Sequence, residues 1–136
     1  MRFMVLVKAT KETEQGVLPT TAQLSEMGKF NEQLVKDGVM LAGEGLQASA
    51  KGARLRFDGG RTTVTDGPFA ETKELVAGFW IVQGKSKEEI VERFMRAPFE
   101  GGQEIEIRQV FEAEDFGENF TPELRDQEQR LRDGVK

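Results

Sequence analysis

Charged side chains gather in the stretch VTDGPFAETKELVAGFWIVQ, residues 64–83. Its first half places Asp66, Glu71, Lys73 and Glu74 around a Gly-Pro turn, and its second half is almost wholly apolar. Carboxylates beside an ammonium group at the mouth of a strand could bind a polar ligand or share a proton. The same charges could instead be solvated and keep an apolar strand soluble. Residue types alone leave both interpretations open.

Two carboxylates are the candidate catalytic groups. Asp66 could act as an acid/base or ligand acceptor, or it could fasten the turn by accepting backbone hydrogen bonds. Glu44 stands between two glycines after an apolar strand, where it could face a cavity with a tunable pKa or lie in a turn. The candidate ligand-binding residues are Phe69, Glu71, Lys73 and Glu74.

Other residues near this stretch have a structural and a functional interpretation. Trp80 is expected in the core, where its indole N–H needs an acceptor. Phe69 either plugs the edge of the core or lines a pocket. Arg54 and Arg56 alternate with apolar residues and are expected in solvent, although they could supply an anion site.

Composition excludes several classes of chemistry. The chain of 136 residues contains no cysteine, histidine or tyrosine, which removes thiol nucleophiles, Cys or His zinc sites and Ser-His-Asp triads within one chain. A magnesium-type site made only of oxygen ligands is still compatible with the composition, but we expect no metal site. The net charge of −5 disfavours nucleic acid as a partner. No apolar run approaches a membrane span or a signal-peptide core, so a cytoplasmic protein is expected.

A dinucleotide-like motif is present but lacks its structural context. Residues 43–48 read Gly-x-Gly-x-x-Ala after a strand, yet the motif must open a helix. Gly52 and a hairpin follow too soon for one. We therefore expect no nucleotide cofactor.

Hydrophobic periodicity and turn residues predict the elements that position these side chains. Thr20 and Ser86 are predicted N-caps of two helices, each with a capping-box partner three residues on. The expected apolar helix positions are Leu24, Met27, Phe30, Leu34, Val35, Ile90, Val91, Phe94 and Met95. Strands are predicted at 3–7, 39–42, 54–57, 62–65, 76–83 and around 105–111, with a loop over 9–19 and a charged helix starting at Thr121-Pro122.

The order of these elements predicts a ferredoxin-like α+β fold, an antiparallel sheet with two helices on one face and an added β-hairpin. The strands at 3–7 and 76–82 are apolar on both faces. Two helices cover only one face, so the other needs a second cover. A second copy of the chain is the simplest cover, which predicts a homodimer.

Residues 66–74, Asp-Gly-Pro-Phe-Ala-Glu-Thr-Lys-Glu, followed by Gly78-Phe79, resemble the signature of the DGPF proteins of the YCII-related family. The segments MRFMVLV and GVMLAGEGL are also similar to that family. The likeness covers residues 1–113 and leaves 114–136 as a charged C-terminal extension with a short helix. It implies a ferredoxin-like dimeric α/β barrel with a cleft near the turn.

The resemblance also implies two kinds of function. Some members of the wider group act on small molecules, including a chlorohydroxyquinol dechlorinase, and one branch uses a His–Asp pair. Asp66 corresponds to that aspartate, and this chain has no histidine. We expect a small-molecule-binding protein or enzyme with a carboxylate-lined cleft. The alternative is a non-catalytic regulatory or interaction domain, linked in some members to extracytoplasmic-function sigma factors.

Overall fold

The computed structural model describes residues 1–135. A four-stranded sheet in the order β2-β5-β1-β6 forms the body, and β3 and β4 form a separate two-stranded ribbon. The strands are β1 (Arg2–Lys8), β2 (Met40–Gly45), β3 (Ala53–Asp58), β4 (Arg61–Asp66), β5 (Val76–Gln83) and β6 (Ile105–Gln109). The helices are α1 (Lys11–Glu14), α2 (Thr21–Lys36), α3 (Lys87–Phe94) and α4 (Pro122–Asp133), with 3₁₀ turns η1 (Ser49–Lys51), η2 (Thr72–Glu74) and η3 (Ala113–Asn119).

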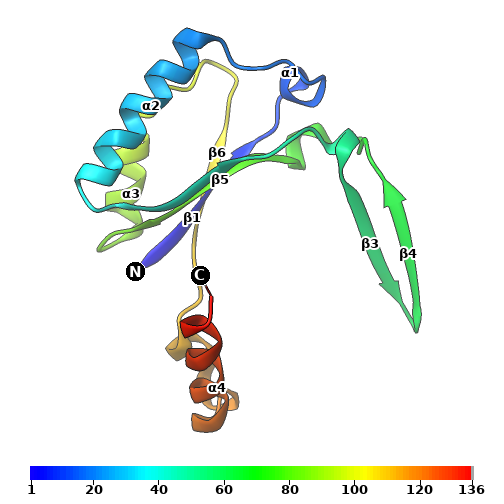
Figure 1. Cartoon of the computed structure of the whole chain (residues 1–136), viewed down its shortest axis with the longest axis vertical. Coiled ribbons are helices and arrows are strands. Elements are labelled where there is room, and N and C mark those ends of the chain that lie inside the picture. Colours follow the sequence, from blue (N-terminus) through cyan, green and yellow to red (C-terminus); the bar gives the residue numbers. More distant parts are fainter. Residues whose placement is uncertain (136) are drawn as a thin grey trace.

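The connectivity is ferredoxin-like. With the β3–β4 ribbon set aside, the chain runs β1-α2-β2-β5-α3-β6, and every strand pair in the sheet is antiparallel. Helices α2 and α3 lie on the same face of the sheet (Figure 1). The predicted α+β fold is therefore confirmed.

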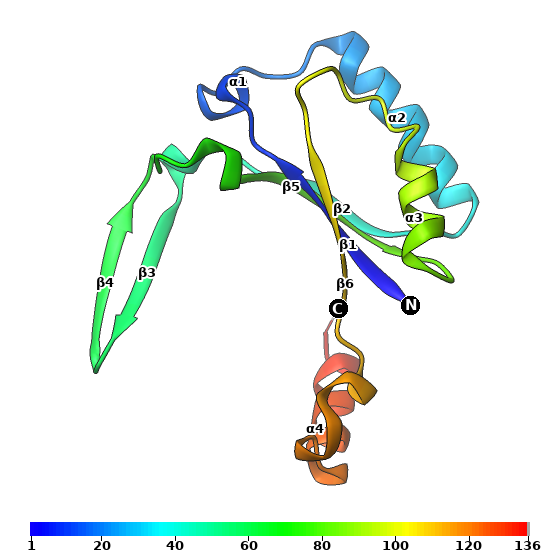
Figure 2. The ribbon, with the colours of Figure 1, turned by 180° about the vertical axis from the view of Figure 1, so that it is seen from behind.

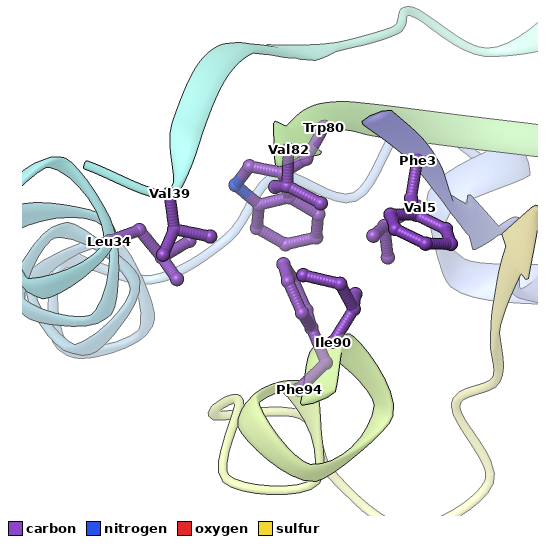
Figure 3. Packing of buried hydrophobic residues seen from close by; sticks show 8 residues of the cluster. All are labelled: Phe3, Val5, Leu34, Val39, Trp80, Val82, Ile90 and Phe94. Atoms are coloured by element: carbon purple, nitrogen blue, oxygen red, sulfur yellow. The ribbon is translucent and has the colours of Figure 1, made fainter. Parts of the chain in front are cut away.

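The core lies between the sheet and these two helices (Figure 3). It contains Phe3, Val5, Leu34, Val39, Trp80, Val82, Ile90 and Phe94. Trp80 meets Phe94 edge to face at a centroid distance of 5.1 Å, and its indole N–H donates to the side-chain oxygen of Asn31 at 2.9 Å. The prediction that Trp80 is a core residue needing one acceptor is confirmed.

Both main helices begin at the predicted caps. Thr20 forms a complete capping box with Gln23. Ser86 accepts from the N–H of Glu89, but the Glu89 carboxylate reaches the N–H of Lys85 instead of closing a box. The apolar faces are narrower than predicted, because four of the expected core residues are exposed. These are Leu24, Val35, Val91 and Met95.

Three segments differ from the prediction. The expected loop after β1 contains α1, capped by Thr10. Strand β2 continues to Gly45, so Glu44 pairs with Phe79 in the sheet and the turn interpretation of Glu44 is wrong. Strand β6 ends at Gln109, and the predicted strand residue Phe111 lies beyond it, 63% exposed.

The sheet face opposite the helices has no cover within residues 1–135. Because facing residues of antiparallel strands share a face, Met4, Leu6, Phe79 and Ile81 form its half-buried apolar centre. Glu44 lies at the β2 edge of this open face, beside Phe79. Lys8 and Glu106 form an ion pair of 3.3 Å on its β6 side.

Two parts project away from the body. The hairpin arm, residues 53–66, extends from one end of the sheet, and the C-terminal segment, residues 111–133, extends from the other (Figures 1 and 2). The predicted anchors of α4, Leu124 and Leu131, are 45% and 61% exposed. No helix among residues 1–135 is both long and apolar enough to cross a bilayer.

Candidate functional site

The Gly-Pro turn, residues 66–69, closes the base of the hairpin arm. Asp66 is the last residue of β4, and the N–H of Gly67 donates to the carbonyl of Gly52 at 3.0 Å. A Cβ atom on Gly67 would lie 1.8 Å from the carbonyl oxygen of Ser49. Only glycine allows the turn to approach η1 this closely.

Ser49 ties this turn to α1. Its hydroxyl oxygen accepts from the N–H of Phe69 at 3.0 Å, and its hydroxyl donates to the carboxylate of Glu14. The N–H of Ser49 donates to the same carboxylate at 2.9 Å. These two bonds, the hydroxyl bond first, hold the pKa of Glu14 below its ordinary value. The turn is thus fastened through side chains outside its own sequence.

Neither Glu14 nor Ser49 is among the site residues predicted from the sequence. The two residues lie 35 positions apart, and only the folded chain brings them together. A local signal existed near one of them, because Thr10 and Thr13 form a capping box at the start of α1, the helix that contains Glu14. Nothing local marks Ser49.

Asp66 does not fasten the turn. Within residues 1–135 its carboxylate accepts no hydrogen bond, and the side chain is exposed. The turn bonds that an aspartate at this position often supplies are replaced here by Ser49 and Gly52. The carboxylate is therefore available to a ligand.

Arg54 links two of the predicted ligand-binding residues. Its guanidinium carbon lies 3.9 Å from the centroid of the Phe69 ring, the geometry of a cation–π contact. The same guanidinium is 3.8 Å from the Glu71 carboxylate, and both side chains of this ion pair are more than half exposed. Phe69 is half-buried. The group presents an aromatic face, a cation and an anion side by side.

Comparison with known proteins identifies the family. A model of the YCII-related domain matches residues 1–114. The chain belongs to the YCII-related family. The predicted resemblance is therefore confirmed, and residues 115–136 lie beyond the matched region.

This YCII-related chain is also similar to individual proteins. It is 48% identical over 40 residues to an uncharacterized protein of Rhizobium meliloti (strain 1021), over 29% of this chain and 32% of that protein. It shares 16% identity and a TM-score of 0.40 with the 5-chloro-2-hydroxyhydroquinone dehydrochlorinase of Burkholderia phenoliruptrix AC1100 in complex with 2,5-dihydroxybenzoquinone, covering 84% of this chain and 98% of that one. That likeness is too distant to bear on what this chain binds.

The remaining predicted site residues of this YCII-related chain are spread out. Glu44 lies on the open face of the sheet, and within residues 1–135 neither a hydrogen bond nor an ion pair joins it to another predicted site residue. Lys73 and Glu74 lie in η2 and are exposed. The chain thus brings Phe69 and Glu71 together through Arg54, while Asp66, Glu44, Lys73 and Glu74 remain apart as single exposed charges.

Two surface hollows lie away from the Gly-Pro turn. One of about 330 Å³ sits between α2 and α3, where Asp37 accepts from Arg93 at 2.7 Å. The pKa of Asp37 is lowered mainly by a hydrogen bond from Gln33 and next by the hydrogen bond from Arg93. The Asp37 carboxylate is therefore already paired within the chain. The other, about 260 Å³, lies at the end of β6. Among residues 1–135 no three acidic side chains converge as a metal site would require.

Proposed function

We propose that this YCII-related protein binds a small aromatic anion at the base of the hairpin arm, with Asp66 as hydrogen-bond acceptor or acid/base. The observation that carries the proposal is the free carboxylate of Asp66. The turn is held by hydrogen bonds to Ser49 and Gly52, so the Asp66 carboxylate makes no hydrogen bond that a ligand would have to break. An exposed side chain that makes no hydrogen bond of its own, in a turn held firmly by other residues, is suited to contact a ligand.

The neighbouring side chains define the ligand's chemistry. Arg54 offers guanidinium donors for a carboxylate, and Phe69 offers a ring face for stacking. Asp66 would accept a hydrogen bond from a hydroxyl group. A hydroxylated aromatic acid satisfies all three requirements, with Glu71, Lys73 and Glu74 setting the charge around the site.

A second copy of the chain would complete the site. In one chain the Asp66, Glu44 and Arg54 side chains are exposed, whereas ligand sites are concave and largely enclosed. The open apolar sheet face, with Glu44 at its edge, is the surface a second copy would cover. A homodimer formed through this face would enclose the carboxylates that are exposed to solvent in a single chain.

Isothermal titration calorimetry with 4-hydroxybenzoate tests the proposal. Wild-type protein is expected to bind it, and Asp66→Asn is expected to weaken binding by about tenfold, since a hydrogen bond to a charged group contributes roughly 1.5–3 kcal/mol. Benzoate, which lacks the hydroxyl group, should bind Asp66→Asn and wild type equally.

Asp58→Asn is the matched control, because Asp58 is another exposed aspartate at a strand end of the same arm. It should leave both titrations unchanged. No binding of either compound, or an equal response of Asp58→Asn and Asp66→Asn, would contradict the proposed site.

A non-catalytic interaction domain is the second candidate. It is supported by the C-terminal segment, where Phe111 and Phe116 remain 63% and 52% exposed. Exposed aromatic rings of this kind are typical of protein contacts. On this second proposal, deleting residues 114–136 should change the oligomeric state, and neither the full-length nor the shortened chain should bind 4-hydroxybenzoate.

A further inference from the structure

The hollow between α2 and α3 has an apolar base and a charged rim. Six side chains line it, and they are Phe30, Gln33, Leu34, Asp37, Arg93 and Arg96. Leu34 is fully buried and Phe30 is half-buried, so these two form the base. The volume of about 330 Å³ falls within the range of small-molecule sites. The hollow lies on the helix side of the sheet, away from the hairpin arm (Figure 1).

The one carboxylate in this hollow is already paired. Gln33 donates to both oxygens of Asp37 at 3.0 Å, and Arg93 donates to one of them at 2.7 Å. The hydrogen bond from Gln33, and next the one from Arg93, lower the pKa of Asp37, and the charge of Lys36 adds to the effect. Asp37 is therefore ionised at neutral pH and offers little attraction to a cationic ligand.

The two arginines keep most of their hydrogen-bond donors. A guanidinium group carries five N–H donors, and Arg93 contacts Asp37 through Nη1 alone. Within residues 1–135, the side chain of Arg96 forms neither a hydrogen bond nor an ion pair. Two positive charges and one negative charge thus line the hollow. The excess of one positive charge matches an anion that carries a single negative charge.

The helix ends beside the hollow do not oppose an anion. Free carbonyl groups give the C-terminal end of a helix a partial negative charge. At the end of α2 the carbonyls of Gln33, Leu34 and Val35 each accept a backbone N–H from the following turn. At the end of α3 the carbonyls of Arg93 and Phe94 do the same. The guanidinium groups therefore dominate the local field.

We propose that the hollow between α2 and α3 binds a short-chain monocarboxylate. Arg96, with the remaining donors of Arg93, holds the carboxylate, because a planar guanidinium matches a carboxylate in charge and geometry. The alkyl chain lies on Phe30 and Leu34 at the base. This site shares no residue with the proposed site at the Gly-Pro turn, and it does not require a second copy of the chain.

Isothermal titration calorimetry of the full-length protein with hexanoate tests this site. Wild type is expected to bind, and Arg96→Gln should weaken binding by about tenfold, since the carboxylate loses a charged hydrogen-bond donor. Asp37→Asn should tighten binding several-fold, because it removes the negative charge while its amide oxygen can still accept from Arg93. Acetate, which lacks the alkyl chain, and 1-hexanol, which lacks the carboxylate, should each bind at least tenfold more weakly than hexanoate.

Arg61→Gln and Asp58→Asn are the matched controls, because both residues are exposed on the hairpin arm. Both variants should bind hexanoate as wild type does. The site is overturned if wild type does not bind hexanoate, if Arg96→Gln binds as tightly as wild type, or if Arg61→Gln loses as much affinity as Arg96→Gln. Weaker binding by Asp66→Asn with wild-type binding by Arg96→Gln would place the carboxylate at the Gly-Pro turn instead.

Discussion

The hydroxyl oxygen of Ser49 accepts a hydrogen bond from the backbone N–H of Phe69 at 3.0 Å, although the residues are 20 positions apart. The same hydroxyl donates to Glu14. One side chain thus connects α1, η1 and the Gly-Pro turn. This relay of hydrogen bonds, from Phe69 through Ser49 to Glu14, explains how the turn keeps its shape while the Asp66 carboxylate stays free.

Ser49→Ala should destabilise the protein. The substitution leaves the N–H of Phe69 without its acceptor and removes one of the two hydrogen bonds that Ser49 donates to the Glu14 carboxylate, at a cost of about 1–3 kcal/mol. The midpoint of thermal unfolding should fall by several degrees. Ser25→Ala, at an exposed position of α2, is the control and should be neutral or slightly stabilising. Equal midpoints for both variants would refute the relay.

Gly67→Ala should disrupt the turn. Its Cβ would meet the Ser49 carbonyl oxygen at 1.8 Å, so backbone must move, and forced displacement in a packed region costs roughly 1–3 kcal/mol. Gly45→Ala is the matched control, because a Cβ there meets nothing within 4 Å. Urea denaturation should show a lower midpoint for Gly67→Ala alone. A wild-type midpoint would show that the close approach is not maintained in solution.

Glu14 should make stability depend on pH in the acid range. Its pKa in the folded protein lies below the ordinary value of 4.5, so its stabilising contribution is present above that value and is lost as pH falls through the folded pKa. Glu14→Gln should lower the unfolding midpoint at neutral pH and reduce the drop between neutral and acid pH. Glu12→Gln, exposed on the same helix, should keep the wild-type profile, and identical profiles for all three proteins would count against the relay.

Asn31→Leu should destabilise the core through Trp80. The indole N–H would lose its acceptor at 2.9 Å, and an unpaired buried donor costs about 1–3 kcal/mol. Asn31→Asp retains an acceptor oxygen and should lose less. Trp80 is the chain's one tryptophan, so its fluorescence during guanidinium unfolding measures the difference directly. A Leu variant as stable as the Asp variant would show that the bond contributes nothing.

Ile81→Lys should prevent dimerisation through the open sheet face. Ile81 pairs with Met4 on that face, and a second copy would have to bury the new ammonium group without a partner. Sedimentation velocity should give a dimer for wild type and a monomer for the variant. Leu18→Lys, at a position already 81% exposed, should remain dimeric. A dimeric Ile81→Lys protein would place the interface elsewhere.

Local signals predicted most elements. Thr20 caps α2 because its side chain bonds an N–H three residues away, and Gly59 and Gly60 adopt the positive φ values of the predicted hairpin turn. The conformation of Glu44 was harder to predict. It belongs to strand β2 only because β5 lies alongside and Phe79 of β5 pairs with it. Flanking glycines could not reveal that pairing.

By itself, the sequence determined the classes of chemistry that are absent, the strand and helix periodicity, and the family signature at Asp66–Glu74. These depend on residue type and on spacings of a few positions, which the chain carries in any conformation. Only the tertiary structure decided that Ser49 fastens the turn, that Arg54 stacks on Phe69, and that Asp66 is left free. Those contacts join segments separated by loops and strands, so they exist only after the sheet register has brought the segments together.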